Sequence, residues 1–269
     1  MTTYTSSEEE WSAVATDITA KMTDFLKQYR TPLFRDLGAH AAGEGTGSYL
    51  ELGSGLFVLT NEHVAACRET GGRLVHKFHD CDDFFLVAGN HASQPLPFDL
   101  SIIPVSREMW EQHSHNSKAI SVSQISVAHT PVPNEILVLA GFAGEDAVFR
   151  FGAMTAVATT SVSREVSLPK TDNRFSGRFH FGIAYNPNLA TKVVGRRDLP
   201  RPPGLSGSTV WNTRFVECQM QGKPWTPEQA MVTGVVWGWP SNIGCLVAIR
   251  AEYVRSFLLE AAVRLKLGI

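Results

Sequence analysis

The sequence lacks both a long hydrophobic run and an excess of charge of either sign. Its 269 residues include 24 basic and 26 acidic side chains, which gives a formal net charge of −2. General binding to nucleic acids depends on an excess of lysine and arginine, so this balance argues against it. No apolar stretch approaches the roughly 20 residues that a membrane-spanning helix needs. We therefore expect a globular protein that binds neither nucleic acid nor a membrane.

Cysteine is also scarce. The four cysteines form no Cys-x-x-Cys pair and are too few to scaffold a chain of this length; they are Cys67, Cys81, Cys218 and Cys245. The first residues carry three consecutive glutamates (8–10) and no basic segment followed by an apolar one, so they do not resemble a secretory leader. Unless a leader preceded this sequence, we expect a cytoplasmic protein with reduced thiols. Two disulfides are the alternative.

An amphipathic helix is predicted at the N-terminus. Ser7 and Glu10 have the spacing of a capping box, and glutamates in the first turn complement the helix dipole. Apolar residues then recur at spacings of three and four until Thr31-Pro32, namely Trp11, Val14, Ile18, Met22, Phe25 and Tyr29. We expect this stripe to pack on the rest of the chain. A surface for a regulatory protein partner, or for a second copy, is the alternative.

From about residue 45 the pattern changes to short strands. Runs rich in Val, Ile, Thr and Phe alternate with Gly, Pro, Asn and Asp, with little helical periodicity between them. The predicted strands are 55–60, 84–88, 100–105, 136–142, 148–151, 153–161, 178–185, 208–211, 231–237 and 245–249. A second helix is predicted after them, because apolar residues recur every four positions from Tyr253 to Leu265. Many short strands without intervening helices favour sandwiches or barrels over a parallel α/β sheet.

Three short segments carry side chains that could act together. A histidine after a strand, an aspartate at a strand start and a Gly-x-Ser-Gly turn are each more often structural than catalytic. Together they supply His63, Asp99 and Ser206, and a serine hydroxyl needs an adjacent base to act as a nucleophile. The segments are Gly45-Thr46-Gly47 leading to Leu59-Thr60-Asn61-Glu62-His63-Val64, then Phe98-Asp99-Leu100-Ser101-Ile102-Ile103, then Pro203-Gly204-Leu205-Ser206-Gly207-Ser208-Thr209.

This combination resembles the trypsin/chymotrypsin-like serine peptidases, and within them the bacterial stress-protease type. That family carries a Gly-Thr-Gly strand, a Leu-Thr-Asn-x-His-Val strand end, an Asp-Leu-x-Ile/Val-Ile/Leu segment and Gly-x-Ser-Gly-Gly/Ser, and all four match here in order. Residues 133–142 also resemble the strand that opens the second barrel, and residues 234–238 resemble the strand that edges the substrate cleft. The likeness extends over about residues 40–260.

The resemblance implies a mainly β, chymotrypsin-like fold with two six-stranded antiparallel β-barrels. An N-terminal amphipathic helix and a C-terminal helix flank the barrels. The expected organisation is a helical segment at 1–31 and a peptidase domain at 32–269, with the first barrel at about 40–120, the second at about 131–250 and the closing helix at about 251–267. The polar stretch 112–130 would join the two barrels.

The resemblance also implies a role for each matching residue. His63 would take the proton from Ser206 and pass it to the leaving amine, while Asp99 orients the imidazole. The backbone N–H groups of Gly204 and Ser206 would form the oxyanion hole. Substrate would contact Pro200, Val236, Trp237 and Gly238. The implied activity is that of a serine endopeptidase acting on protein or peptide substrates, without cofactor or metal.

Two departures from the family pattern bear on activation and specificity. Leu205 stands where secreted members have an aspartate that pairs with a freed N-terminus, so activation by N-terminal cleavage is not expected. Pro200, at the expected base of the primary pocket, is not acidic. This predicts cleavage after a small or aliphatic side chain, although nearby Asp198 leaves cleavage after Lys or Arg open.

Two functions other than a constitutively active peptidase are compatible with the sequence. One is a catalytically inactive scaffold that serves as a binding or regulatory module, since fold alone does not establish function. Leu205 is the best support for that alternative. The other is a peptidase that stays inactive until a partner binds the N-terminal helix.

Two polar clusters lie outside these motifs. Residues Lys192–Arg201 are basic and adjoin the serine segment, where we expect a solvated loop, with a site for an acidic substrate or regulator as the alternative. The second cluster has residue types that suit zinc, but its spacing matches no common structural zinc pattern. We therefore expect a polar turn without a metal at His76, His79, Cys81, Asp82 and Asp83.

Overall fold

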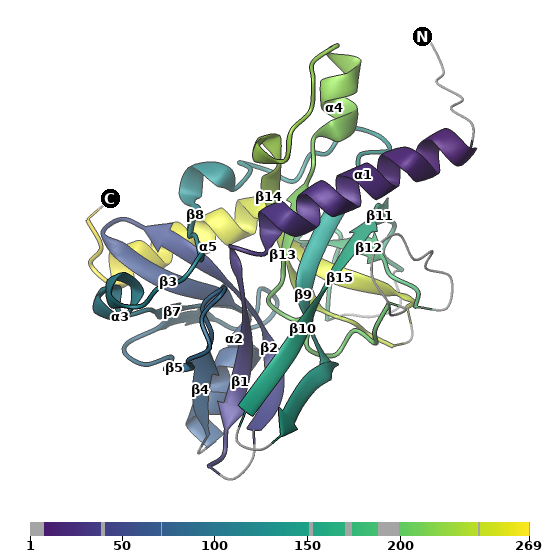
Figure 1. Cartoon of the computed structure of the whole chain (residues 1–269). Helices are drawn as coiled ribbons and strands as arrows, with labels where there is room; N and C mark the ends of the chain where they lie inside the picture. The colour runs from purple at the N-terminus through teal and green to yellow at the C-terminus, as the bar shows by residue number, and fades with distance from the viewer. Residues whose placement is uncertain are drawn as a thin grey trace.

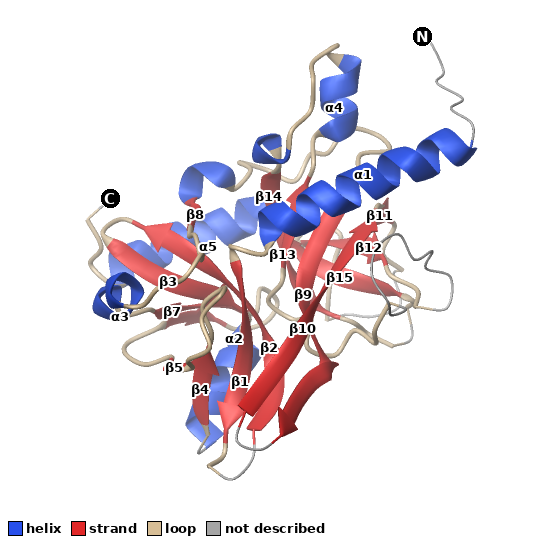
Figure 2. Ribbon diagram, in the orientation of Figure 1, coloured by secondary structure: helices blue, strands red, loops and turns tan. Residues whose placement is uncertain are grey.

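Two curled antiparallel sheets form the body of the protein, and a helix lies at each end of the chain (Figures 1 and 2). The structure is a computed structural model that describes residues 8–38, 41–70, 72–150, 153–169, 174–187, 199–241 and 243–268. Helix α1 spans Glu8–Leu26 and helix α5 spans Ala251–Arg264. The mainly β, chymotrypsin-like fold class predicted from the sequence is confirmed.

The first sheet has the order β5-β4-β1-β2-β3-β7-β6, and β8 pairs with β2 in parallel. All other pairings in this sheet are antiparallel. The strands are β1 (Arg30–Asp36), β2 (Ala41–Leu52), β3 (Gly55–Thr60), β4 (Arg73–His76), β5 (Phe85–Leu86), β6 (Ala92–Gln94), β7 (Leu100–Pro104) and β8 (Ile120–Ser121). Buried Tyr49, Leu74 and Phe78 belong to the core of this sheet.

The second sheet has the order β10-β9-β13-β14-β15-β12-β11, with antiparallel pairing throughout. Its strands are β9 (Leu137–Arg150), β10 (Ala153–Ser163), β11 (Glu165–Val166), β12 (His180–Ala184), β13 (Thr209–Asn212), β14 (Met231–Gly238) and β15 (Cys245–Arg250). The described sheets thus hold eight and seven strands, where the sequence predicts six in each.

Short helical turns connect the strands. They are α2 (Glu62–Ala65), α3 (Arg107–Gln112) and α4 (Phe215–Met220), with 3₁₀ turns η1 (Ala66–Thr70), η2 (Val122–Gln124) and η3 (Pro227–Gln229). Helix α2 matters most for the site, because it follows β3 directly and carries His63.

The first sheet begins at Arg30, earlier than the sequence predicts. Thr31-Pro32 indicates only the end of the first helix, yet both residues lie in β1. Proline lacks the N–H that a central strand must donate. Pro32 is tolerated because β4 pairs with β1 only from Leu33 onwards.

The apolar stripe of α1 packs on the body of its own chain. Ile18 and Met22 are fully buried in a core that also includes residues of α5 and of both sheets. Phe25 lies edge-on to Trp211 of β13, with 5.8 Å between the ring centroids. Ser7 of the predicted capping box and the side chain of Trp11 lie outside the described residues.

The long β9–β10 hairpin reaches across the first sheet (Figure 1). Phe34 and Val75 of the first sheet form a small apolar cluster with Ala147 of β9 and Ala156 of β10. Gly43 of β2 permits the close approach, because a Cβ atom there would lie 3.3 Å from the Cβ of Ala147. The hairpin therefore fastens the second sheet to the first.

All four cysteines lie among the described residues; each is buried, and no disulfide joins any two of them. Burial raises the pKa of the Cys67 thiol to about 11 and also raises the pKa of Cys245. Of the helices described, none combines the length and the apolar character needed to cross a bilayer.

The histidine-rich segment after β4 is divided between core and surface. His76 is buried, with Nδ1 2.9 Å from the Tyr49 hydroxyl. Nε2 of His79 lies 3.4 Å from a carboxylate oxygen of Asp80, and Asp82 pairs instead with Lys77. No group of three or more His, Cys, Asp or Glu side chains in the described part of the chain could hold a metal ion.

We predict that His76 makes the fold sensitive to acid. Burial lowers its pKa from 6.5 to about 3. A histidine whose pKa is lower in the folded state stabilises the fold above its unfolded pKa, and that contribution is lost as the pH falls from about 6.5 towards 3. In urea unfolding at a series of pH values, His76→Gln should lose less unfolding free energy on acidification than the wild type. Equal slopes for the two proteins would contradict this.

Candidate active site

A buried carboxylate holds His63 at two points. One oxygen of Asp99 accepts a hydrogen bond from the backbone N–H of His63 at 2.9 Å, and the other lies 2.6 Å from Nδ1 of its ring. The side chain of Asp99 is 4% exposed, whereas that of His63 is 51% exposed. The pair therefore combines a desolvated acceptor with an imidazole whose other edge faces outwards.

The register of the first sheet brings these two residues together. Thr60, the last residue of β3, pairs with Ser101 of β7, so Asp99 and His63 lie just beyond the same end of the two strands. Asp99 has a left-handed backbone with φ 51°, which is strained for a residue with a side chain. The Asn61 side-chain amide stabilises this conformation by donating to the Asp99 carbonyl at 2.8 Å.

The second sheet also supports the Asp99 loop. Nε2 of His180, on β12, lies 2.9 Å from the carbonyl oxygen of Pro97. Phe98 packs against Phe179 and Tyr253, with ring centroids 5.2 and 5.4 Å away. The aspartate that orients His63 is thus held by residues of both sheets and of α5.

Ser206 lies on a tight turn that precedes β13. The N–H of Leu205 donates to the carbonyl of Pro202 at 2.9 Å, and Gly204 has φ +96°. Proline followed by a residue with positive φ is the signature of a type II turn, with Pro203 and Gly204 at its centre. A Cβ atom on Gly204 would lie 2.5 Å from the Phe142 carbonyl oxygen, so only glycine fits there.

Successive carbonyls of this turn are anchored to neighbouring strands. The N–H of Gly144 donates to Pro203, while Thr46 donates its hydroxyl to Gly204 and its N–H to Ser206, all at 2.8 to 2.9 Å. The Pro203 carbonyl and the Gly204 N–H belong to the same peptide group, in which C=O and N–H point in opposite directions. Because the carbonyl points towards β9, the Gly204 N–H points away from β9.

Two backbone donors of the turn are left for an external acceptor. Among the described residues, the N–H groups of Leu205, Gly207 and Ser208 bond to carbonyls within the chain. The N–H groups of Gly204 and Ser206 bond to no carbonyl among the described residues. These are the two donors that the sequence predicts for the oxyanion hole.

Apolar packing holds the Leu205 side chain. Its side chain is fully buried in the core of the second sheet, together with Tyr185 and Val236. Burial of a leucine side chain contributes about 1.5–3 kcal/mol. Apolar contacts of Leu205 and the hydrogen bonds of Thr46 thus anchor the turn.

Gly45 brings the histidine and serine segments close to each other. A Cβ atom there would lie 2.8 Å from a methyl group of Val64 and 3.1 Å from the Ser206 carbonyl oxygen. His63 precedes Val64 directly. Between the described residues, however, no hydrogen bond joins Nε2 of His63 to the hydroxyl of Ser206.

The residues predicted to contact substrate differ in their accessibility. Val236 is fully buried, and its backbone N–H and C=O pair with Ser208 and Gly207. It therefore supports the serine turn and has no free backbone group for a substrate. Trp237 and Gly238, which follow it on β14, are half-buried.

The region of the expected primary pocket is only partly described. Pro200 is buried, and its carbonyl accepts a hydrogen bond from the Tyr185 hydroxyl at 2.8 Å. Lys192, Arg196, Arg197 and Asp198 lie outside the described residues. Arg201 is exposed, and its backbone N–H donates to the Glu145 carboxylate at 2.9 Å.

We predict that Thr46→Val loosens the serine turn. The valine keeps the shape of threonine but removes the hydroxyl that donates to Gly204 and accepts from the Phe142 N–H at 2.9 Å. Leaving such buried partners unsatisfied costs about 1–3 kcal/mol of unfolding free energy, measurable by urea unfolding. Thr16→Val is the matched control, because the Thr16 hydroxyl lies on the exposed face of α1 and donates to the Ser12 carbonyl of the same helix. Equal stabilities of the two variants would contradict the role of Thr46.

Comparison with known proteins supports the fold. No protein-family model and no curated protein matches the sequence. The serine endoprotease from Yersinia pestis has a similar crystal structure, with a TM-score of 0.53 and 14% identity over 91% of this chain and 66% of that chain. Rv3671c from M. tuberculosis, in an inactive mutant form, gives a TM-score of 0.48 and 17% identity over 92% and 93% of the two chains. A structure from work on the Sesbania mosaic virus VPg protein gives 0.49 and 12% over 86% and 90%. The similarity to the Yersinia serine endoprotease is therefore a similarity of fold.

Proposed function

We propose that this protein is a serine endopeptidase in which His63, Asp99 and Ser206 form the catalytic triad. The observation that carries the proposal is the two-point attachment of His63 to a buried carboxylate. A surface histidine with a purely structural role does not need both its backbone and its ring held by one desolvated acid. The arrangement leaves Nε2 of the ring as the atom that can accept a proton.

The proposed reaction proceeds in two halves. In the first, the Ser206 oxygen attacks the scissile carbonyl carbon while its proton passes to Nε2 of His63. The oxygen of the substrate carbonyl becomes an anion, which the N–H groups of Gly204 and Ser206 stabilise. Collapse breaks the carbon–nitrogen bond, and the leaving amine takes the proton from Nε2. An acyl group remains on the serine oxygen.

The second half restores the enzyme. Water gives one proton to Nε2 of His63 while its oxygen attacks the acyl carbon. The new tetrahedral species collapses, the carboxylic acid leaves, and the serine oxygen recovers the proton from Nε2. Throughout, Asp99 accepts the Nδ1–H and stabilises the imidazolium. Each proton that His63 accepts is thus returned within the cycle.

The proposal requires His63 and Ser206 to approach each other in the substrate complex. Catalytic hydrogen bonds are often long in structures without substrate and tighten when it binds. The half-exposed side chain of His63 leaves the ring accessible for such an approach.

A binding or regulatory module without activity is the second candidate function. It is favoured by one specific observation, namely that no His63–Ser206 hydrogen bond occurs between the described residues. In that case the two free N–H groups of the serine turn would bind a carbonyl or carboxylate without reaction. Regulation by a protein partner at α1 is compatible with either function; such a partner would meet the exposed polar face of the helix, which carries Asp17 and Lys21.

We predict that Ser206→Ala abolishes both peptide hydrolysis and labelling by a fluorophosphonate probe, since loss of a triad member costs several orders of magnitude in rate. Ser208→Ala is the matched control two residues away. The Ser208 hydroxyl is buried and has no hydrogen-bond partner among the described residues, so its loss should preserve labelling. Labelling that persists in Ser206→Ala, or a wild type that is never labelled, would contradict the enzyme assignment.

We also predict cleavage after small or aliphatic side chains. Pro200 is bonded through its carbonyl to Tyr185, a residue of an apolar core against which the neighbouring Leu199 also packs. Digestion of a peptide library, read by mass spectrometry, should show Ala, Val or Leu before the cut. Cleavage almost solely after Lys or Arg would overturn this preference and indicate a role for Asp198.

A further inference from the structure

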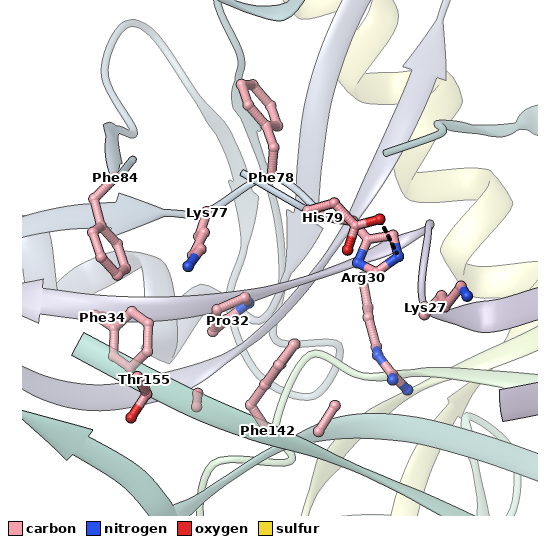
Figure 3. A pocket seen from close by; sticks show the side chains of 13 residues that line it. Lys27, Arg30, Pro32, Phe34, Lys77, Phe78, His79, Phe84, Phe142 and Thr155 are labelled. Atoms are coloured by element: carbon pink, nitrogen blue, oxygen red, sulfur yellow. Dashed lines mark ion pairs between the residues drawn. The ribbon is translucent and has the colours of Figure 1, made fainter. Parts of the chain in front are cut away.

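A cavity of about 300 Å³ lies between the first sheet and the β9–β10 hairpin. Figure 3 shows its lining, with Arg30 and Phe34 from β1, Lys77 and Phe84 from the chain around β4 and β5, and Phe142 from β9. This volume is at the lower end of the range for small-molecule pockets. The cavity does not include His63, Asp99 or Ser206.

Three cations and one carboxylate line the cavity. The carboxylate, Asp80, accepts a hydrogen bond from the Asn116 side-chain amide at 2.7 Å and lies 3.4 Å from Nε2 of His79. Two of the cations already have acid partners. Lys27 pairs with Asp24 at 2.5 Å, and Lys77 pairs with Asp82 at 3.3 Å. Arg30 makes no ion pair with any described residue. One of its terminal nitrogens donates to the Thr160 hydroxyl at 3.4 Å. A guanidinium carries five N–H donors, so most of those on Arg30 remain available.

Aromatic rings line one part of the cavity beside Arg30. Its guanidinium carbon lies 5.8 Å from the centre of the Phe142 ring. Phe34 and Phe84 meet edge-to-face further along the cavity, with 5.8 Å between their centroids. Desolvation lowers the pKa of Arg30 to about 10, so the group stays charged at neutral pH. Withdrawal of a charge from water is costly unless an opposite charge pairs with it.

We propose that this cavity binds a small carboxylate with an aromatic or aliphatic body. Arg30 would hold the carboxylate through its planar fork of donors, a geometry that suits this group. The phenyl rings of Phe34, Phe84 and Phe142 would cover the apolar body. The carboxylate belongs to a free organic acid or to the C-terminus of a peptide, two sources that share this chemistry.

Phe142 connects the cavity to the serine turn. Its ring lines the cavity, while its backbone N–H donates to the Thr46 hydroxyl, which in turn donates to the Gly204 carbonyl. A ligand that moves Phe142 would therefore shift the hydrogen bonds that anchor the turn. This effect of the ligand on the serine turn rests on the proposed function, because it makes the carboxylate an effector of the peptidase.

Binding is tested on the full chain by calorimetric titration with 3-phenylpropanoate and its neutral amide. The wild type should bind the carboxylate at least tenfold more tightly than the amide, and Arg30→Gln should abolish this preference. Arg107→Gln, on the exposed surface of α3, is the matched control and should keep it. No saturable binding, equal affinities, or a preference that persists in Arg30→Gln would overturn the site.

Two further arms complete the binding test. If Arg30→Gln fails to fold, Arg30→Lys should reduce the preference several-fold, because a point charge lacks the fork; an unchanged preference would overturn the role of Arg30. A short peptide ending in phenylalanine, compared with its C-terminal amide, distinguishes the two sources. Tighter binding of the peptide acid than of 3-phenylpropanoate assigns the site to a chain terminus, and weaker binding assigns it to a free acid.

The connection to the serine turn is tested separately by NMR of ¹⁵N-labelled protein. Saturation with 3-phenylpropanoate should shift the amide signals of Thr46 and Gly204, while that of Gly222, after α4, should stay unchanged. Unmoved Thr46 and Gly204 signals would overturn the connection. These readouts do not require activity, so a wild type that resists fluorophosphonate labelling would refute the peptidase and leave the binding result intact.

Discussion

The candidate site depends on one threonine of the first sheet that binds the serine turn of the second. Through its hydroxyl and its N–H, Thr46 anchors the carbonyls of Gly204 and Ser206. Two hydrogen bonds of this kind contribute about 1 kcal/mol each in net terms, and their loss costs more because buried partners are left unsatisfied. Leu205 carries no charge, and its side chain is fully buried in the core of the second sheet. Neutral contacts therefore keep the turn in place.

Each sheet alone supplies half of the site. The first contributes His63 and Asp99, and the second contributes the serine turn and, through His180, a hydrogen bond to the Asp99 loop. The β9–β10 hairpin joins the halves, since β9 provides both the N–H that holds Pro203 and the ring that lines the cavity beside Arg30.

Much of this arrangement follows from the sequence. The strand at 55–60 is found with the predicted bounds, and those at 100–105, 231–237 and 245–249 differ by one residue at one end. Apolar residues with β propensity dominate these strands, so local pattern and tertiary burial agree. His63 and Asp99 meet as expected, because they occupy adjacent ends of paired strands.

Other features depend on contacts that no local pattern reveals. Strand β1 was missed because Pro32 normally interrupts a central strand, and its acceptance depends on where β4 stops pairing. His76 lies in a segment with polar neighbours, yet the Tyr49 hydroxyl and the rings of Phe78 and Phe85 enclose it. The Gly45-Thr46-Gly47 motif predicts a strand, but the partners of Thr46 are distant in the sequence. Only the assembled sheets show that the Thr46 hydroxyl joins the Gly204 carbonyl to the Phe142 N–H.

The central claim is that the serine turn presents two N–H groups to an anion, while His63 accepts the proton of the Ser206 hydroxyl. A crystal structure of the protein after reaction with diisopropyl fluorophosphate tests this most directly. We expect a phosphoryl group on the Ser206 oxygen, one phosphoryl oxygen within hydrogen-bond distance of the N–H groups of Gly204 and Ser206, and the His63 ring beside the adduct. An unmodified Ser206, or an adduct whose oxygen contacts neither N–H group, would contradict the account.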